Sequence, residues 1–196
     1  MKLLMHICCA NCALYPVSKL TADGHEIRGL WFNPNIHPYT EYQNRLEAVK
    51  RLEMLCDTED TNPPIPPLEK GGKRGFKVEY IDEYGLKEFL RNVVGNEDNR
   101  CEYCYTTRLE ETAKRAKDMS ADAFTTSLLV SPYQKFDMIM DIGRMMQDRY
   151  SVEFYIEDFR KGFNEGRRMS RELGLYQQKY CGCIYSEMER YISEKT

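Results

Sequence analysis

The chain has 196 residues, of which 42% are hydrophobic and 30% are charged, and its net charge is −3. This composition fits one globular domain with a single core and excludes a uniformly basic, nucleic-acid-binding surface. It also excludes a membrane-spanning helix, because the longest apolar runs have about five residues and about 20 are needed. The apolar run at residues 3–7 is too short for a secretory signal, so we expect a cytoplasmic protein with no membrane partner.

Apolar periodicity and turn residues predict strands that alternate with helices. The predicted strands cover residues 2–7, 25–32, 76–81, 123–126 and 153–156. The predicted helices cover residues 13–21, 39–56, 86–94, 101–118, 133–149, 163–175 and 184–194. This alternation predicts an α/β fold of the Rossmann-like or HUP-like type. An open parallel sheet would have flanking helices, with additional helices at the C-terminal end.

Residues 57–75 differ in composition from the rest of the chain. They contain four prolines and three glycines, which cannot form a helix or a central strand. We expect an exposed, mobile loop within a single domain that spans residues 1–196. An inert insertion is the favoured interpretation, and a lid over a site is the alternative.

Seven of the eight cysteines fall into three short groups that lie far apart in the chain. The groups are Cys8, Cys9 and Cys12; Cys101 and Cys104; and Cys181 and Cys183. In a reducing compartment, clustered cysteines indicate metal binding or redox chemistry rather than disulfides. The first group follows the first strand, where many parallel α/β proteins carry a glycine-rich phosphate loop. The eighth cysteine, Cys56, completes the apolar stripe of a predicted helix and is predicted to belong to the core.

The number of thiols argues for more than one simple metal site. A tetrahedral zinc ion or a four-iron cluster takes at most four protein ligands. Seven converging cysteines therefore favour two centres, a cluster plus another ion, or one centre with spare thiols. A zinc ribbon has its two cysteine pairs within roughly 15–20 residues, and these groups are much farther apart. The spacing favours iron–sulfur over structural zinc, and a thioredoxin-like dithiol at residues 101–104 is a weaker alternative.

Polar residues near the predicted strand ends are candidates for catalysis and substrate binding, because ligands bind at the carboxyl edge of a parallel sheet. The predicted catalytic residues are His37, Tyr133 and Asp158. The predicted substrate-binding residues are Asn35, Tyr42, Arg45, Thr126, Gln134 and Arg160. For His37 the alternative role is capping of the helix that follows. For residues 158 and 160 the alternative is a simple ion pair with no role in the site. His6 is predicted to be a hydrogen-bonded core residue. Residues 160–179 carry a local charge of +4, which fits either contact with RNA or a solvated helix face.

Several strings, taken in order, resemble one known family. They are HICCANC, WFNPNIHPYTEYQNR, CEYCYTTRLEETA, DAFTTSLLVSPYQ, EDFRKG and YQQKYCGCIYS. They resemble the cobalamin-independent epoxyqueuosine reductases, the QueH family. The resemblance covers nearly the whole chain and leaves Cys56 and residues 57–75 outside. It implies an oxidoreductase that removes the epoxide oxygen of epoxyqueuosine at the wobble position of tRNA with a GUN anticodon, which gives queuosine.

The resemblance also implies cofactors, which are a [4Fe-4S] cluster and a second iron ion beside it. We assign Cys9, Cys101 and Cys104 to the cluster. The remaining grouped thiols, Cys8, Cys12, Cys181 and Cys183, are assigned to a shared or second-metal shell. A low-potential donor such as ferredoxin or flavodoxin would supply electrons.

Two other functions stay open at this point. A tRNA sulfur-transferase related to the ATP-pyrophosphatase proteins would need an SGGxDS-like loop after the first strand, and this chain has none. A zinc-stabilised RNA-binding module would hold zinc without sulfide, so the identity of the metal separates it from both enzymes.

Overall fold

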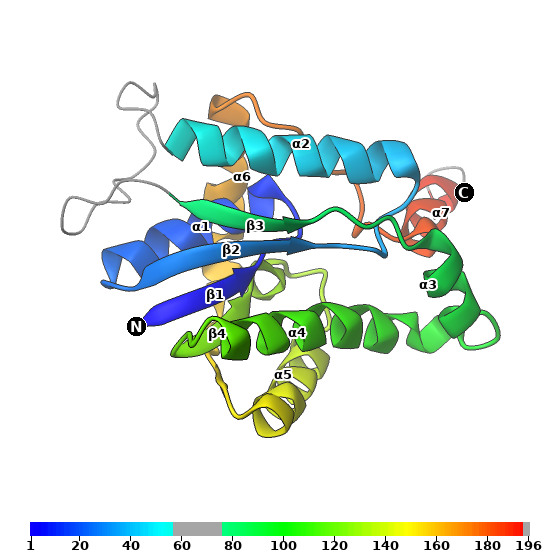
Figure 1. The fold of residues 1–196 in the computed structure, drawn as a ribbon. Coiled ribbons are helices and arrows are strands. Elements are labelled where there is room, and N and C mark those ends of the chain that lie inside the picture. Colours follow the sequence, from blue (N-terminus) through cyan, green and yellow to red (C-terminus); the bar gives the residue numbers. More distant parts are fainter. Residues whose placement is uncertain (57–75, 194–196) are drawn as a thin grey trace.

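The computed structural model describes residues 1–56 and 76–193. Five parallel strands form one sheet in the order β3-β2-β1-β4-β5 (Figure 1). The strands are β1 (Lys2–His6), β2 (Glu26–Phe32), β3 (Lys77–Ile81), β4 (Ala123–Thr126) and β5 (Glu153–Phe154). The predicted open α/β sheet is confirmed, and the loop predicted at residues 57–75 lies outside the described residues.

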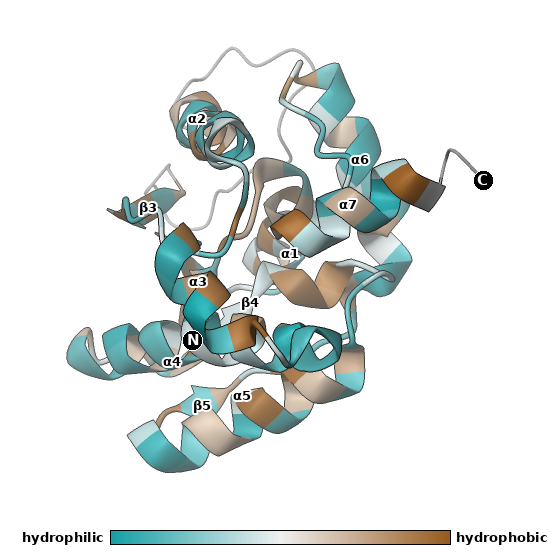
Figure 2. Cartoon of the chain, turned by 90° about the vertical axis from the view of Figure 1, so that its right-hand side faces the viewer, coloured by the Kyte–Doolittle hydropathy of each residue, from teal (hydrophilic) through white to brown (hydrophobic). Residues whose placement is uncertain are grey.

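Helices cover both faces of the sheet. They are α1 (Ala10–Ala22), α2 (Tyr39–Cys56), α3 (Leu86–Val93), α4 (Arg100–Asp118), α5 (Phe136–Tyr150), α6 (Phe163–Glu172) and α7 (Ile184–Ser193). Helices α1, α2 and α6 lie on one side of the sheet, and α4 and α5 lie on the other (Figures 1 and 2). Among the described residues, no helix is both long enough and apolar enough to cross a bilayer.

Two helices begin three residues away from their predicted starts. Helix α1 begins three residues earlier than predicted, because the Cys9 thiol accepts a hydrogen bond from the Cys12 amide at 3.3 Å and caps the helix. Helix α5 begins three residues later, because residues 131–135 form turns. One of these turns is closed by the Ser131 hydroxyl, which accepts from the Tyr133 amide at 3.3 Å. The first hydrogen bond caps a helix and extends it, whereas the second stabilises a turn that competes with the helix.

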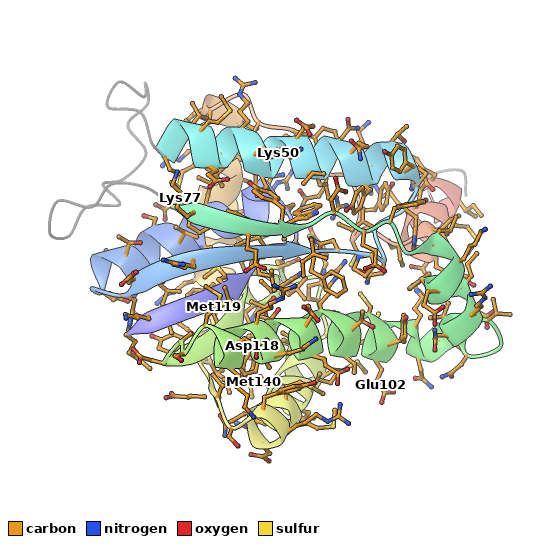
Figure 3. The ribbon with its side chains drawn as sticks, viewed as in Figure 1. Lys50, Lys77, Glu102, Asp118, Met119 and Met140 are labelled. Atoms are coloured by element: carbon orange, nitrogen blue, oxygen red, sulfur yellow. The ribbon has the colours of Figure 1, made fainter. Side chains whose placement is uncertain are left out.

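Strand β1 lies at the centre of the core. Leu3, Leu4 and Met5 are buried, as expected for a parallel strand with helices on both faces. Figure 3 shows side chains filling the space between the sheet and its helices, with Glu102 pointing outward from α4. At the carboxyl end of β1, the Cys8 amide donates to the Ser127 hydroxyl at 3.0 Å. The ends of β1 and β4 are thereby joined at the edge where ligands of parallel sheets bind.

His6 is a buried histidine at this edge, as predicted. Its Nδ1 lies 3.0 Å from the Thr126 hydroxyl, and its Nε2 lies 3.2 Å from Asn33 Oδ1. Burial, followed by the positive charge of Arg108, lowers the pKa of His6 from 6.5 to about 4. The ring is therefore neutral in the folded protein and acts as a hydrogen-bonded spacer between β4 and the loop after β2.

Acidification of the metal-free protein from pH 6.5 to 5 is expected to lower its free energy of unfolding by about 2 kcal/mol through His6. The unfolded chain takes up a proton near pH 6.5, whereas the folded chain keeps His6 neutral until about pH 4. The stability from the neutral ring is complete above pH 6.5 and is lost as the pH falls toward 4. Denaturant unfolding at several pH values measures this slope. His6→Gln should make the pH dependence shallower without removing it, because the pKa of His37 is lowered to about 4 as well, and equal slopes for the two proteins would contradict the prediction.

Candidate metal centre

The first thiol group lies where β1 passes into α1. The sulfur atoms of Cys8, Cys9 and Cys12 all lie within 4.8 Å of one another, and all three residues are buried. The sulfurs of Cys8 and Cys9 are 3.7 Å apart. Two thiolates on one tetrahedral ion with bonds of about 2.3 Å are separated by about 3.8 Å. The spacing of this group therefore fits a single metal ion.

The three thiols differ in how readily they lose a proton. Hydrogen bonds from Cys12 and Cys9 lower the pKa of the Cys8 thiol well below its usual value. The hydrogen bond to Cys8 raises the pKa of Cys12, and burial raises the pKa of Cys9. The group thus favours one thiolate at Cys8 with two neighbouring thiols as donors. A bound metal would displace the remaining protons.

The second set of thiols combines the start of α4 with the segment before α7. Cys101 and Cys104 lie in the first turns of α4, and Cys181 and Cys183 precede α7. Burial and the charges of the other three cysteines raise the pKa of Cys104 to about 12, against the opposing effect of the Arg108 charge. All four thiols are therefore close enough to interact electrostatically. Among the described residues these four thiols do not form a group as tight as the first.

Arg45 holds the segment before α7 in place. Its guanidinium donates to the carbonyl oxygens of Tyr180 and Cys181, each at 2.9 Å, and its Nε donates to Glu41 at 2.6 Å. Arg45 is 1% exposed, and Glu41 also accepts a hydrogen bond from the Tyr176 hydroxyl. The structure gives Arg45 a structural role. The substrate contact predicted for it remains a prediction.

The same segment reaches both thiol sets. Gln178 donates to the Cys12 sulfur at 3.4 Å, and the His37 amide donates to the Gly182 carbonyl at 2.7 Å. Gly182 has a φ of 142°, and a Cβ there would lie 3.2 Å from a nitrogen of Arg45, so both its backbone conformation and its close packing favour glycine. Residues 176–183 thus cross the carboxyl edge of the sheet from the first thiol group toward the second.

Asn35 and Arg108 form a polar pair beside the second thiol set. Asn35 Nδ2 donates to the Cys104 sulfur, and Arg108 Nε donates to Asn35 Oδ1 at 2.8 Å. Asn35 was predicted to bind substrate, whereas Arg108 was not singled out from the sequence. The available signal was helical spacing. Arg108 lies four residues after Cys104 and seven after Cys101, which places all three near one face of α4.

His37, a predicted catalytic residue, lies close to this pair. It is fully buried, and neither ring nitrogen has a hydrogen-bond partner among the described residues. Its ring packs against Phe89, with ring centroids 4.9 Å apart, and against Tyr84. Burial, followed by the charge of Arg108, lowers the pKa of His37 to about 4. The structure therefore presents a neutral imidazole whose two nitrogens have no protein partner in this part of the chain.

Three of the predicted substrate-binding residues have their polar groups engaged within the protein. Gln134 donates to the Cys181 sulfur at 3.1 Å and accepts from the Tyr105 hydroxyl at 2.7 Å. Thr126 bonds with the ring of His6, and the Tyr42 hydroxyl donates to Asp82 at 2.8 Å. Of the three, only Gln134 contacts a thiol.

Three more of the predicted site residues lie at the surface. They are Tyr133 and Asp158, which were predicted to be catalytic, and Arg160, which was predicted to bind substrate. Tyr133 is 80% exposed and contacts the ring of Phe163 edge-on. Asp158 pairs with Arg160 at 2.6 Å and also accepts from the Arg160 amide at 3.0 Å. Within residues 1–56 and 76–193, none of their hydrogen bonds or ion pairs reaches a cysteine. The geometry fits the simple ion pair that was the alternative for residues 158 and 160.

Taken together, the fold and the site define an α/β protein with a buried, thiol-rich site suited to metal at the carboxyl edge of a parallel sheet. The seven grouped cysteines form no disulfides with one another. The profile of the family described as "Epoxyqueuosine reductase QueH" matches residues 3–189. The chain belongs to the QueH family.

Curated relatives agree with this assignment over nearly the whole chain. The Epoxyqueuosine reductase QueH of Dehalococcoides mccartyi is 35% identical over 190 residues, which covers 97% of this chain and 94% of the relative. The protein of the same name from Thermotoga maritima is 33% identical and covers 95% of this chain and 91% of its own length. The protein of the same name from Streptococcus pyogenes is 31% identical, and the match covers 94% of this chain and 69% of the relative.

Proposed function

We propose that this chain is an epoxyqueuosine reductase that removes the epoxide oxygen of epoxyqueuosine at the wobble position of tRNA. Membership of the QueH family supports this activity. The observation that carries the proposal is the meeting of thiols from the beginning, middle and end of the chain at one sheet edge. Neither a sulfur-transferase nor a zinc-stabilised RNA-binding module is supported by the comparisons.

The donor set fits iron. The tight donor group among the described residues consists of soft thiols alone, which favours iron–sulfur chemistry or zinc, and the long spacing between the cysteine groups favours the former. We assign a [4Fe-4S] cluster to Cys9, Cys101 and Cys104. The remaining thiols, Cys8, Cys12, Cys181 and Cys183, would hold a second iron, alone or shared. Close packing of the first thiol group supports a single ion there, so Cys9 would lie between the two centres.

Conversion of an epoxide to an alkene consumes two electrons and two protons and releases the oxygen as water. When bound, the metal centres would supply the electrons and would stabilise negative charge on the oxygen. The chain would exclude bulk water around its buried thiols, which are Cys8, Cys9, Cys12 and Cys104, and would position the substrate. The neutral ring of His37, with both nitrogens unpartnered among the described residues, is suited to hold or transfer a proton. Gln134 would orient the substrate near Cys181.

The wobble base must leave the anticodon stack to reach buried thiols. The basic residues of segment 160–179 are exposed and are suited to phosphate contacts; they are Arg160, Lys161, Arg167, Arg168, Arg171 and Lys179. Helix α6, which carries three of them, packs directly on α1, the helix that begins in the first thiol group. We infer a cytoplasmic enzyme that receives electrons from a low-potential donor such as ferredoxin or flavodoxin.

The activity is tested with protein reconstituted anaerobically with iron and sulfide. Incubation with epoxyqueuosine-containing tRNA and a low-potential reductant should remove one oxygen atom from the nucleoside, which mass analysis detects. The protein should also contain sulfide and more than four irons per chain, as a cluster plus another ion requires. Stoichiometric zinc without sulfide, or addition of sulfur to the nucleoside, would favour the alternatives.

Reversal of charge on α6 is expected to weaken tRNA binding by roughly tenfold or more and to flatten its salt dependence. The variant Arg167→Glu/Arg171→Glu changes two exposed arginines and leaves the thiols untouched. Lys114→Glu/Lys117→Glu on α4 makes the same change in charge on the other side of the sheet and serves as control. Equal affinities of the two variants for tRNA would show that α6 is not part of the tRNA-binding surface.

A further inference from the structure

Arg108 is a buried cation without an acidic partner. Its side chain is 1% exposed, and no carboxylate lies within 4 Å of it in the part of the chain that the structure describes. Its one hydrogen bond from Nε goes to the neutral amide of Asn35. Arginine keeps its charge at any ordinary pH, so this charge must be balanced by something else in the site.

The other fully buried arginine is balanced within the protein. Arg45 pairs with Glu41 at 2.6 Å and donates from its other two nitrogens to two backbone carbonyls. The difference matters because a buried, unpaired charge is costly, and removal of one partner of a buried pair typically costs about 3–5 kcal/mol. Arg108 therefore lies where a negative charge is expected that residues 1–56 and 76–193 do not supply as a carboxylate.

The groups that face Arg108 identify the missing charge. Arg108 lies close enough to the thiols Cys104 and Cys181 to interact with them electrostatically, and His6 and His37 lie within the same range. Through Asn35 it is also linked by two hydrogen bonds to the Cys104 sulfur. The side chain of Asn35 is neutral and a histidine ring is either neutral or cationic, so the nearby groups that can become anionic are the thiols.

We propose that Arg108 is the built-in counterion of the metal-loaded thiol site, a positioning residue that orients Cys104 through Asn35 and favours the reduced state of the centre. The inference rests on the proposed function, because it requires thiolates bound to a redox-active metal. An added electron makes the centre more negative, and a fixed positive charge in a buried environment of low dielectric stabilises that form. Removal of the charge should therefore make the midpoint potential more negative.

The test compares reconstituted Arg108→Gln with the wild-type protein and with Arg115→Gln. Arg115 lies two turns farther along α4, is partly exposed and pairs with Glu79 and Glu111, so its variant loses the same charge away from the thiols. Iron and sulfide per chain are measured first, and midpoint potentials follow by redox titration monitored by electron paramagnetic resonance. Arg108→Gln should lower the equilibrium constant for reduction of the centre by about tenfold, which shifts the midpoint potential by about 59 mV in the negative direction for a one-electron couple. Arg115→Gln should match the wild type.

Two further variants keep the result interpretable. Arg108→Lys keeps the charge and should stay close to the wild-type potential. Asn35→Asp places a carboxylate beside Arg108 and should shift the potential in the negative direction, so it gives the answer if Arg108→Gln fails to fold or load. Loaded Arg108→Gln, or failing that Asn35→Asp, with an unchanged potential would overturn the inference and leave the proposed function intact. A wild-type protein without iron and sulfide would overturn both.

Discussion

Replacement of Cys104 by alanine is expected to lower turnover of epoxyqueuosine-containing tRNA by more than roughly a hundredfold. Loss of a residue that only supports a metal ligand commonly costs 10–100-fold, so loss of a ligand should cost more. Cys104 is buried at the start of α4, interacts with three other cysteines and accepts a hydrogen bond from Asn35. The measurement is initial rate together with iron and sulfide content after identical reconstitution. Cys101→Ala is expected to abolish turnover for the same reason.

Cys56→Ala provides the matched control. Cys56 ends α2 and packs against the core, about 16 Å along the helix axis beyond Arg45. The substitution also removes one sulfur atom, yet it should leave iron content and turnover close to those of the wild type. If Cys56→Ala and Cys104→Ala lose activity equally, the division between ligand and core cysteines is wrong.

Arg45→Met is expected to lower the free energy of unfolding of the metal-free protein by about 3–5 kcal/mol. The substitution leaves Glu41 buried with no cation, and it removes the donors to the carbonyls of Tyr180 and Cys181. Denaturant unfolding of both proteins under the same conditions measures the difference. Because the segment that carries Cys181 is released, iron content after reconstitution should fall as well.

The double variant Glu41→Gln/Arg45→Met separates the two effects. It removes the uncompensated carboxylate, so part of the lost stability should return, whereas iron content should stay low because the two carbonyls still lack donors. If Arg45→Met instead raised only KM for tRNA, with unchanged stability and iron content, Arg45 would be a substrate contact and not an anchor of residues 176–183.

The sequence determined the features that depend on local pattern. The alternation of β-forming runs with helical periodicity predicted all five strands and the parallel arrangement, because these patterns are written in neighbouring residues. The cysteine groups were visible for the same reason, since each lies within five residues of chain. The separate placement of Cys56 followed from the apolar stripe of α2, and the hydrogen-bonded core role of His6 followed from its position inside β1.

Only the tertiary structure decided which polar side chains surround the thiols. Arg45 was predicted as a substrate contact, and the fold engages its donors with Glu41 and the segment before α7. The burial of Arg108 and the exposure of Tyr133 could not be predicted from the sequence either. The arginine is buried beside Cys104 and Asn35, whereas the tyrosine is largely exposed. A charged residue has no local signal for its partner, because the partner comes from a distant part of the chain and is selected by the packing of α2, α4 and residues 176–183 around one sheet edge.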